Sequence, residues 1–378
     1  MQIDQVVLRE ANLNEMSGWD ELVKRFDNHR VFHTTDWIGS LEDSSKGRPL
    51  FLVYEKKGEI VGCLPGLLTR VGPIRVFGSP LPGWQTRSMG PAFDEKEITT
   101  TEMTALLIPF LEKQYGVHHI EIMSHTLDQE FMNDFGFRGE PRPVFRVPLY
   151  PGDEDRVLKN MKANARQKVK RGVKLGLITR FTYSENFVDE IYDQLVEVYA
   201  RGGNTIPFNK QRVEAFFRHM KEAGDLLAIG VYLPDSDICI ATGLFTVENK
   251  ELILWAWTTR TKYRQYNPTE LMTWTVMQKA MEMGCIVFQI GGGSDFKTKF
   301  GAYPDLSKIR WVRSRYKWLT GARDIAEKCY RWQQAVRGHL ARRRISKKFS
   351  AVVNEDSEEQ KTVQSETLHI FKQQGKKA

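Results

Sequence analysis

A chain of 378 residues with 41% hydrophobic and 11% aromatic residues is long enough for about two folded domains, which excludes a disordered protein. Its formal net charge of +8 is unevenly placed, because residues 320–378 hold 13 Lys and Arg against 7 Asp and Glu, which is +6 and leaves about +2 for the rest. Overall basicity is therefore a poor argument for nucleic-acid binding by the folded body, and we expect no DNA partner.

The cysteine and histidine patterns exclude two common classes of site. The four cysteines are widely spaced without a CxxC pair, so neither a disulfide framework nor a zinc ribbon is expected. No HExxH motif occurs, and we expect no metal. The N-terminus lacks the pattern of a signal peptide, and no run reaches the roughly 18 apolar residues that span a bilayer. These features predict a cytoplasmic protein.

The first 150 residues predict short strands and helices. The clearest element is a hairpin, because two apolar runs flank the polar turn of residues 55–59. The other predicted elements are a strand over 5–9, helices around 19–26 and over 98–115, and strands over 119–123 and 145–149. We place a domain boundary after Tyr150, which gives a first domain of residues 1–150.

Residues 151–318 predict a second domain with a similar order of elements. It opens with a basic helix over 154–171, since residues 156–174 hold 8 Lys and Arg and no acid. Later, Asn267 and Pro268 suit a helix start, and apolar residues at three- and four-residue spacing continue towards Gly284. The remaining elements are helices over 187–199 and 210–223, a hairpin over 226–247, and strands over 252–257, 285–290 and 309–318.

Residues 319–378 differ from both domains. Residues 328–348 hold 8 Lys and Arg, no acid, and apolar residues for one helix face, so they could lie on the inner face of a membrane. Beyond Ser350 the composition is polar and predicts disorder.

Three patterns resemble the Fem-type (FemAB-like) tandem-GNAT aminoacyl- and acyltransferases, a family that includes exopolysaccharide-associated acetyltransferases. Both hairpins look like the central strand pair of the GNAT fold, and ARQKVKRGVKLGL at 165–177 resembles the basic helix that opens the second half of such proteins. NPTELMTWTVMQKAMEMGCIVFQIGG followed by FKTKFG at 296–301 is similar to their closing FK-x-x-FG signature. The resemblance covers about residues 30–318. It implies an α/β fold with mixed sheets, two tandem GNAT-like domains around a cleft, and here a basic C-terminal helical tail.

The resemblance implies a catalytic role for the FKTKFG loop. Lys297 could donate to the oxyanion of acyl transfer or hold a donor phosphate, although a surface lysine is an equal alternative. Phe296 could cover the reacting centre, while Phe300 suits core packing. Asp295 could act as a base or simply as a turn residue.

Donor binding is predicted at the start of the helix that follows Asn267. Ordinary GNAT enzymes hold a CoA pyrophosphate on backbone N–H groups of a glycine-rich turn, but residues 263–268 contain no glycine and Pro268 lacks an N–H. Contacts from side chains would have to replace them, unless this stretch is only a helix cap. The donor-binding candidates are Lys262, Arg264, Asn267 and Thr269.

Acceptor binding is predicted from aromatic and basic side chains. The candidates are Trp37, Arg201, Trp257 and Tyr263. Tryptophans stack on sugars but more often fill cores, and Arg201 has a salt bridge as its alternative.

Together these patterns predict an acyltransferase that moves an acyl group, with acetyl first, from acyl-CoA to an amine of a cell-envelope sugar or peptidoglycan precursor. The first alternative uses aminoacyl-tRNA as the donor within the same fold. The second is a non-catalytic GNAT-like scaffold of an envelope polysaccharide system. Residues 328–348 could make peripheral membrane contact or bind nucleic acid, and tRNA is a partner to consider.

Overall fold

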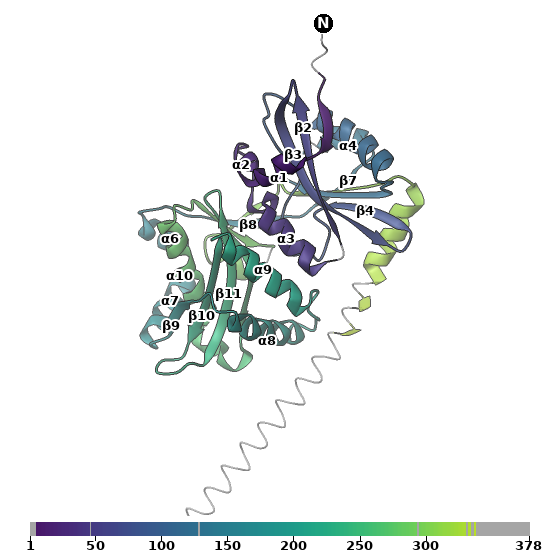
Figure 1. Ribbon diagram of the computed structural model, residues 1–378. Helices are drawn as coiled ribbons and strands as arrows, with labels where there is room; N and C mark the ends of the chain where they lie inside the picture. The colour runs from purple at the N-terminus through teal and green to yellow at the C-terminus, as the bar shows by residue number, and fades with distance from the viewer. Residues whose placement is uncertain are drawn as a thin grey trace, which may run out of the picture. The chain divides into compact units, whose positions relative to one another are not determined.

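The computed structural model describes residues 5–45, 47–127, 129–292, 295–329, 332–333 and 336–337 (Figure 1). It divides into two compact units, of which the first contains Met1–Gln194 and Pro207–Ile325 and the second Leu195–Ile206 and Ala326–Ala378. Both sheets lie in the first unit. Most of the predicted basic tail helix, residues 328–348, falls outside the described residues. Within the described part, no helix combines the length and apolar character needed to cross a membrane.

The first sheet is mixed, with β4 and β6 as its parallel pair. Its order is β1 (Val7–Glu10), β2 (Arg48–Lys56), β3 (Glu59–Val71), β4 (Ile74–Ser79), β6 (His119–Ser124), β15 (Ile309–Ser314) and β7 (Arg138–Pro141), and β5 (Ala92–Phe93) pairs with β3. Its helices are α1 (Leu13–Ser17), α2 (Trp19–Lys24), α3 (Thr35–Ser44), α4 (Thr100–Gln114) and α5 (Gln129–Asp134), with the 3-10 turn η1 (Val31–His33). Helix α4 buries Met103, Leu107 and Leu111 in the core that also holds Phe77 and Ile120.

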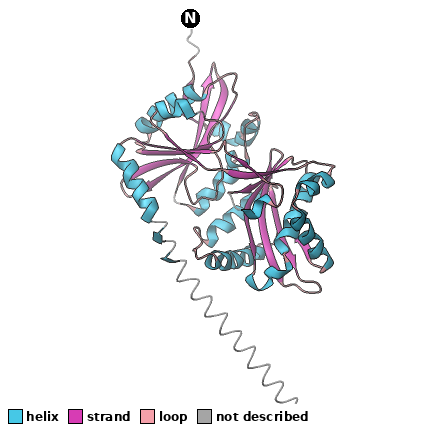
Figure 2. Ribbon diagram, turned by 180° about the vertical axis from the view of Figure 1, so that it is seen from behind, coloured by secondary structure: helices cyan, strands magenta, loops and turns pink. Residues whose placement is uncertain are grey.

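The second sheet is also mixed, with β12 and β13 as its parallel pair. Figure 2 shows the strands in magenta and the helices beside them in cyan. Its order is β14 (Tyr303–Asp305), β8 (Val144–Pro148), β13 (Val287–Gly291), β12 (Glu251–Thr259), β11 (Cys239–Glu248), β10 (Leu226–Tyr232) and β9 (Ile178–Phe181). Its helical elements are α6 (Glu154–Asn160), α7 (Ala163–Lys174), α8 (Asn186–Arg201), α9 (Lys210–Glu222), η2 (Thr261–Tyr266), α10 (Pro268–Glu282) and α11 (Asp295–Thr298). The predicted α/β class with two mixed sheets is confirmed.

Each sheet takes one strand from the other part of the chain. Strand β8 precedes residue 150, yet it pairs with β13 and β14 in the second sheet. Strand β15 lies near residue 310, yet it pairs with β6 and β7 in the first sheet. The division of the sequence at residue 150 therefore does not coincide with the membership of the two sheets.

The predicted single basic helix over residues 154–171 is wrong, because the chain forms two helices there. Helix α6 ends at Asn160, because the following residue, Met161, has an extended backbone (ψ 145°) and a buried side chain. The next residue, Lys162, donates its backbone N–H to the carbonyl of Lys299 at 2.8 Å. The break thus attaches the basic segment to the FKTKFG loop.

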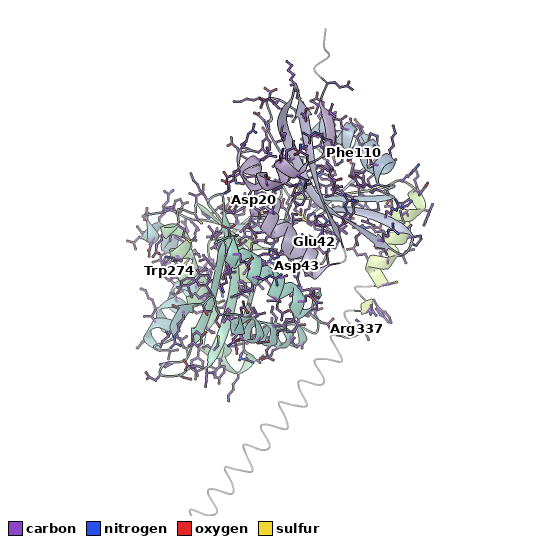
Figure 3. All side chains as sticks on the ribbon, in the orientation of Figure 1. Asp20, Glu42, Asp43, Phe110, Trp274 and Arg337 are labelled. Carbon is purple, nitrogen blue, oxygen red and sulfur yellow. The ribbon has the colours of Figure 1, made fainter. Side chains whose placement is uncertain are left out.

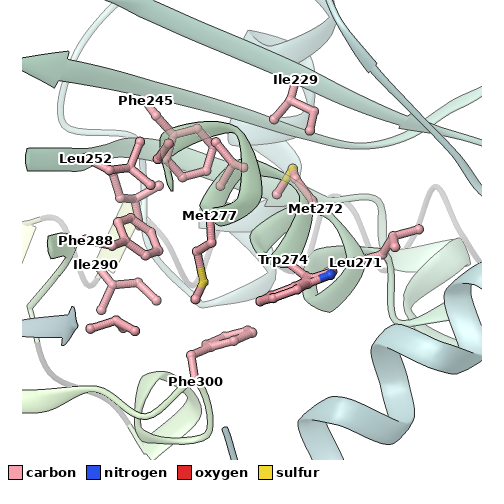
Figure 4. Close-up of a cluster of buried hydrophobic side chains, with 14 of the residues drawn as sticks. Ile229, Phe245, Leu252, Leu271, Met272, Trp274, Met277, Phe288, Ile290 and Phe300 are labelled. Atoms are coloured by element: carbon pink, nitrogen blue, oxygen red, sulfur yellow. The ribbon is translucent and has the colours of Figure 1, made fainter. Parts of the chain in front are cut away.

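Helix α10 lies against one face of the second sheet, as its apolar spacing predicts. Leu271, Trp274, Met277 and Met281 are all buried, and they share one core with Phe288 of β13 (Figure 4). This core supports the strand ends beside which the candidate site lies.

Within the first unit, α3 and α9 lie side by side and connect the two sheets. Asp43, labelled in Figure 3, pairs with Arg218 at 2.5 Å and with His219 at 2.8 Å. The imidazole of His219 lies so close to Gly39 that a Cβ there would be 2.8 Å from its Cε1. Only glycine allows this approach between the two helices.

Candidate functional site

The candidate site lies where the parallel strands β12 and β13 stop pairing. They pair only from Glu251 with Val287 to Ile253 with Gln289, while β12 continues to Thr259. In open α/β sheets, ligands bind outside the carboxyl ends of parallel strands. Here the chain after β12 leads into α10 and the chain after β13 leads into the FKTKFG loop, so both predicted motifs start from this point.

Arg87, in the loop between β4 and β5, reaches the same point from the first sheet. Its Nη2 donates to the carbonyl of Leu254 in β12 at 3.2 Å. A Cβ built on Gly291 would lie 3.0 Å from the Cζ and Nη2 of Arg87, and Gly291 also has a positive φ of 88°. Glycine is therefore required where the guanidinium meets the end of β13. Sequence reasoning missed Arg87, since a loop arginine carries no signal of its long-range partners.

Lys297 is half-buried in α11, and its ammonium donates to the carbonyl of Gly292. Burial and the neighbouring charge of Arg87 lower the pKa of Lys297 to about 8. No carboxylate among the described side chains pairs with it. A lysine of this kind is a cationic donor that titrates close to neutral pH, which is typical of a functional position.

The two phenylalanines of the motif lie in different environments. Phe300 is completely buried and points into the core with Trp274 and Met277 (Figure 4). Phe296 is 40% exposed, and its ring centroid lies 5.8 Å from that of Trp257. The expectation that Phe300 packs in the core is confirmed, while Phe296 and Trp257 form an accessible aromatic pair beside Lys297.

Lys299 holds the loop against α10. Its ammonium lies 2.6 Å from a carboxylate oxygen of Glu270 and 3.2 Å from the centroid of the Phe296 ring. Lys168 of α7 approaches the same carboxylate oxygen at 3.2 Å. Lys299 and Glu270 are both buried, so their pair fixes the loop to the first turn of α10. Sequence reasoning missed this pair, because Lys299 occupies a variable position of the motif.

The four predicted donor-binding residues fall in one stretch at the start of α10. Lys262 and Arg264 are exposed in η2. The predicted helix start at Asn267 and Pro268 is confirmed, although Asn267 has a left-handed backbone (φ 56°) and donates from its side chain to the carbonyl of Gln265 instead of capping α10. The hydroxyl of Thr269 lies 2.5 Å from that of Thr259.

The predicted acceptor residues lie in different surroundings. Trp257 lies beside Phe296, and Tyr263 packs partly against the core of α10. Trp37 is completely buried and donates from Nε1 to Thr86 at 3.0 Å, so in this conformation it is a packing residue. Arg201 ends α8 and belongs to the second unit.

Two further predictions concern acids and metals. Asp295 begins α11, two residues before Lys297. Among the described residues, no group of three or more His, Cys, Asp or Glu could hold a metal ion.

Comparisons with known proteins identify the fold. Residues 159–302 match the acetyltransferase (GNAT) domain family. No curated protein matches the chain. The crystal structure of FemX is similar with a TM-score of 0.67 at 15% identity, over 83% of this chain and 99% of that chain.

Two other solved structures are similar at a lower score. A tandem GNAT protein from the clavulanic acid biosynthesis pathway has a TM-score of 0.52 at 13% identity, over 82% of this chain and 98% of its own. The structure of L-PGS from Bacillus licheniformis has a TM-score of 0.50 at 13% identity, over 85% and 96% of the two chains. Residues 159–302 thus match the GNAT domain family, and the chain has the fold seen in FemX and in the tandem GNAT protein. The resemblance to Fem-type tandem-GNAT proteins is confirmed at the level of fold.

Proposed function

We propose that the protein is an N-acyltransferase that moves an acyl group, with acetyl as the first candidate, from acyl-CoA to an amine of a cell-envelope sugar or peptidoglycan precursor. The observation that carries the proposal is Lys297, a half-buried cation with no carboxylate partner among the described residues, at the ends of β12 and β13. The GNAT domain match over residues 159–302 supports the class of reaction.

Lys297 would act on the charge that develops during transfer. The amine nitrogen bonds to the acyl carbon, the carbon–sulfur bond breaks, the amine loses one proton and the thiol leaves. An ammonium beside the acyl carbonyl stabilises the negative charge on its oxygen, and removing one such donor typically costs about 10²–10³ in rate. Phe296 and Trp257 would exclude water from this centre, since their rings lie 5.8 Å apart at its edge.

The donor would bind along the start of α10. Acyl-CoA supplies the activated thioester, and the exposed cations Lys262 and Arg264 would hold its phosphates. Pro268 at the first helical position removes a backbone donor, so side chains carry more of the binding than in a glycine-rich turn.

The test separates binding from transfer. The full chain is titrated with acetyl-CoA by calorimetry, and thiol release is measured with amino sugars and muramyl peptides as acceptors. We expect Lys262→Ala to weaken acetyl-CoA binding, and Lys297→Ala to keep binding but lose at least about 100-fold in thiol release. Equal thiol release by Lys297→Ala and wild type would remove the catalytic role of Lys297.

A second candidate uses aminoacyl-tRNA as the donor. Two features favour it. Helix α7 is rich in Lys and Arg, which suits the phosphates of an RNA, and the turn at residues 263–268 has no glycine, which makes it a poor binding loop for the pyrophosphate of CoA. Parallel titration with charged tRNA decides between the two. Saturable binding of charged tRNA, without binding of acetyl-CoA, would make aminoacyl-tRNA the first candidate for the donor.

A non-catalytic scaffold is the third candidate, and it rests on the basic composition of residues 328–348. Deletion from Thr320 onwards should reduce sedimentation with anionic vesicles if this segment contacts a membrane. A Lys297→Ala variant that complements a deletion strain as well as wild type would favour the scaffold over the enzyme.

A further inference from the structure

Lys308 is a buried cation that the proposed transfer does not use. It precedes β15, is only 5% exposed, and has no hydrogen-bond or ion-pair partner for its ammonium among the described residues. Burial and the charge of Arg87 lower its pKa to about 7, against the opposing effect of Asp305. The charge of Arg87 also lowers the pKa of Lys297, so the same guanidinium acts on both lysines.

Gln289 is the second unsatisfied group in this region. It is completely buried on β13, and neither its amide nitrogen nor its amide oxygen has a partner among the described residues. Its neighbours Phe288 and Ile290 point into the α10 core, so Gln289 faces the opposite side of the sheet. It forms the last register pair of the parallel ladder, with Ile253, directly before the carbonyl that Arg87 contacts.

The carboxylates of this region are already bound to arginines. Glu251 accepts from Arg30 at 2.6 Å and from Arg146 at 2.5 Å. Asp305 accepts from Arg146 at 3.2 Å and lies 3.9 Å from the ring of His125. Neither carboxylate lies within ion-pair distance of Lys308, so the lysine remains without a counter-charge among the described residues.

Leaving such groups buried and unsatisfied is costly. A buried amide or hydroxyl without a hydrogen bond costs about 1–3 kcal/mol, and an unpaired charge costs more. A protein keeps such groups where a ligand satisfies them, because function tolerates a local loss of stability. A cation, an arginine fork and an amide donor together match one ligand chemistry, an anionic oxygen group.

We propose that Lys308, Arg87 and Gln289 bind an anionic group, a phosphate or a carboxylate, of the amine acceptor. This inference rests on the proposed transfer at Lys297 and specifies its acceptor as an acidic amine. The anion would be held by the first sheet through Arg87 and Lys308 and by the second through Gln289, so it would fix the acceptor beside the transfer centre.

The first experiment measures binding of simple anions to the full chain. Inorganic phosphate and acetate are titrated separately at constant ionic strength, with heat or thermal shift as the readout. We expect saturable binding of one of them, which identifies phosphate or carboxylate as the group, and a loss of at least about tenfold in affinity for Lys308→Met and Arg87→Met. The matched controls are Lys317→Met and Arg70→Met, which replace exposed cations and should bind as wild type does.

The second readout distinguishes a ligand site from a structural role. Lys308→Met should unfold at the same temperature as wild type without anion, or at a higher one, because it removes an unpaired buried charge. A lower melting temperature together with unchanged anion affinity would overturn the proposal. Anion binding that is lost in Arg264→Met and kept in Lys308→Met would also overturn it, by assigning the anion to the donor end.

The outcomes for the anion site and for the proposed function are separate. If wild type binds phosphate through Lys308 but does not bind acetyl-CoA, the anion site stands and the donor assignment fails. If acetyl-CoA binds and is turned over while Lys308→Met has wild-type affinity for every anion, the transferase stands and the anion site fails.

Discussion

Two groups of buried charges in this protein have opposite arrangements. In the first sheet, Glu121 accepts from Arg310 at 2.5 Å, from Arg323 at 3.2 Å and from His119 at 3.0 Å. Burial alone would raise the pKa of the Glu121 carboxyl, but its bonds to His119 and Arg310 lower that pKa to about 2. Lys297, after the end of β13 in the second sheet, is half-buried, and Lys308, directly before β15 of the first sheet, is buried, but neither has a described carboxylate partner.

The difference separates structure from function. Buried charges that pair with each other stay ionised, and removing one of them lowers the stability of the fold. Lysines that are buried without a partner have pKa values shifted towards neutral pH, and removing one should reduce ligand affinity or reaction rate rather than stability. Four experiments test this distinction between groups that stabilise the fold and groups that serve a ligand or a reaction.

The largest expected effect is at Glu121. Replacement by Gln removes the shared acceptor of Arg310, Arg323 and His119 and leaves Arg310 with only Glu140, at 3.5 Å, which should lower the free energy of unfolding by about 3–5 kcal/mol at pH 7. Since the folded pKa is depressed, this contribution is present above the unfolded value and disappears as pH falls towards about 2. Urea unfolding at pH 7 and pH 3 checks both statements. A variant as stable as the exposed control Glu95→Gln would contradict them.

The next comparison is within the FKTKFG motif. Phe300→Ala removes a completely buried ring and should cost about 3–4 kcal/mol of stability. Phe296→Ala, at 40% exposure, should cost less than about 1 kcal/mol and act on thiol release instead. Thermal unfolding and turnover of both variants measure the contrast. Equal losses of stability would show that the two rings share one role.

Lys299 is the intermediate case, a buried lysine that does have a partner. Lys299→Met leaves Glu270 with only Lys168, so we expect a loss of about 2 kcal/mol in the free energy of unfolding. A double-mutant cycle with Glu270→Gln should give a coupling energy of about 1–3 kcal/mol. Additive losses would mean that the pair does not hold the loop.

The smallest expected effect is the pH dependence of Lys308. Its folded pKa is depressed to about 7, so the cost of burying its charge is complete below that pH, shrinks as pH rises and is absent above the unfolded pKa. Lys308→Met should therefore be more stable than wild type at pH 6, and its advantage should shrink by pH 9.5. A difference that does not change with pH would show that the lysine is not desolvated.

Local patterns predicted the elements, and long-range contacts decided the site. Both hairpins and α10 follow from turn residues and apolar spacing, which are properties of neighbouring residues. The motif lysine Lys297 was likewise found from its local context. The pairing of β8 with β13 and of β15 with β6 joins residues far apart in the sequence, and the spacing of apolar residues cannot predict such pairs.

The unpredicted parts of the site have the same origin. Arg87 meets β12 from a position 167 residues away, and Glu270 is buried only because Lys299 returns to it from the next loop. The opposite error occurred at Trp37, which was assigned to the acceptor from its residue type although three aromatic and polar neighbours enclose it. Residue type indicates what a side chain can contact, while the fold determines whether it is accessible.

Strands β8 and β15 each pair in the sheet formed mainly by the other half of the sequence, and this limits how the protein can be divided into fragments. A fragment that ends at residue 150 would carry β8 with no sheet to join, and it would leave β6 and β7 without the strand that lies between them. The complementary fragment would lack β8, so β13 and β14 would each have an unpaired edge. It would also contain β15 without its partners β6 and β7. Such unpaired edges invite aggregation. Neither piece should therefore survive alone, and we expect soluble material only when both are expressed together and recombine.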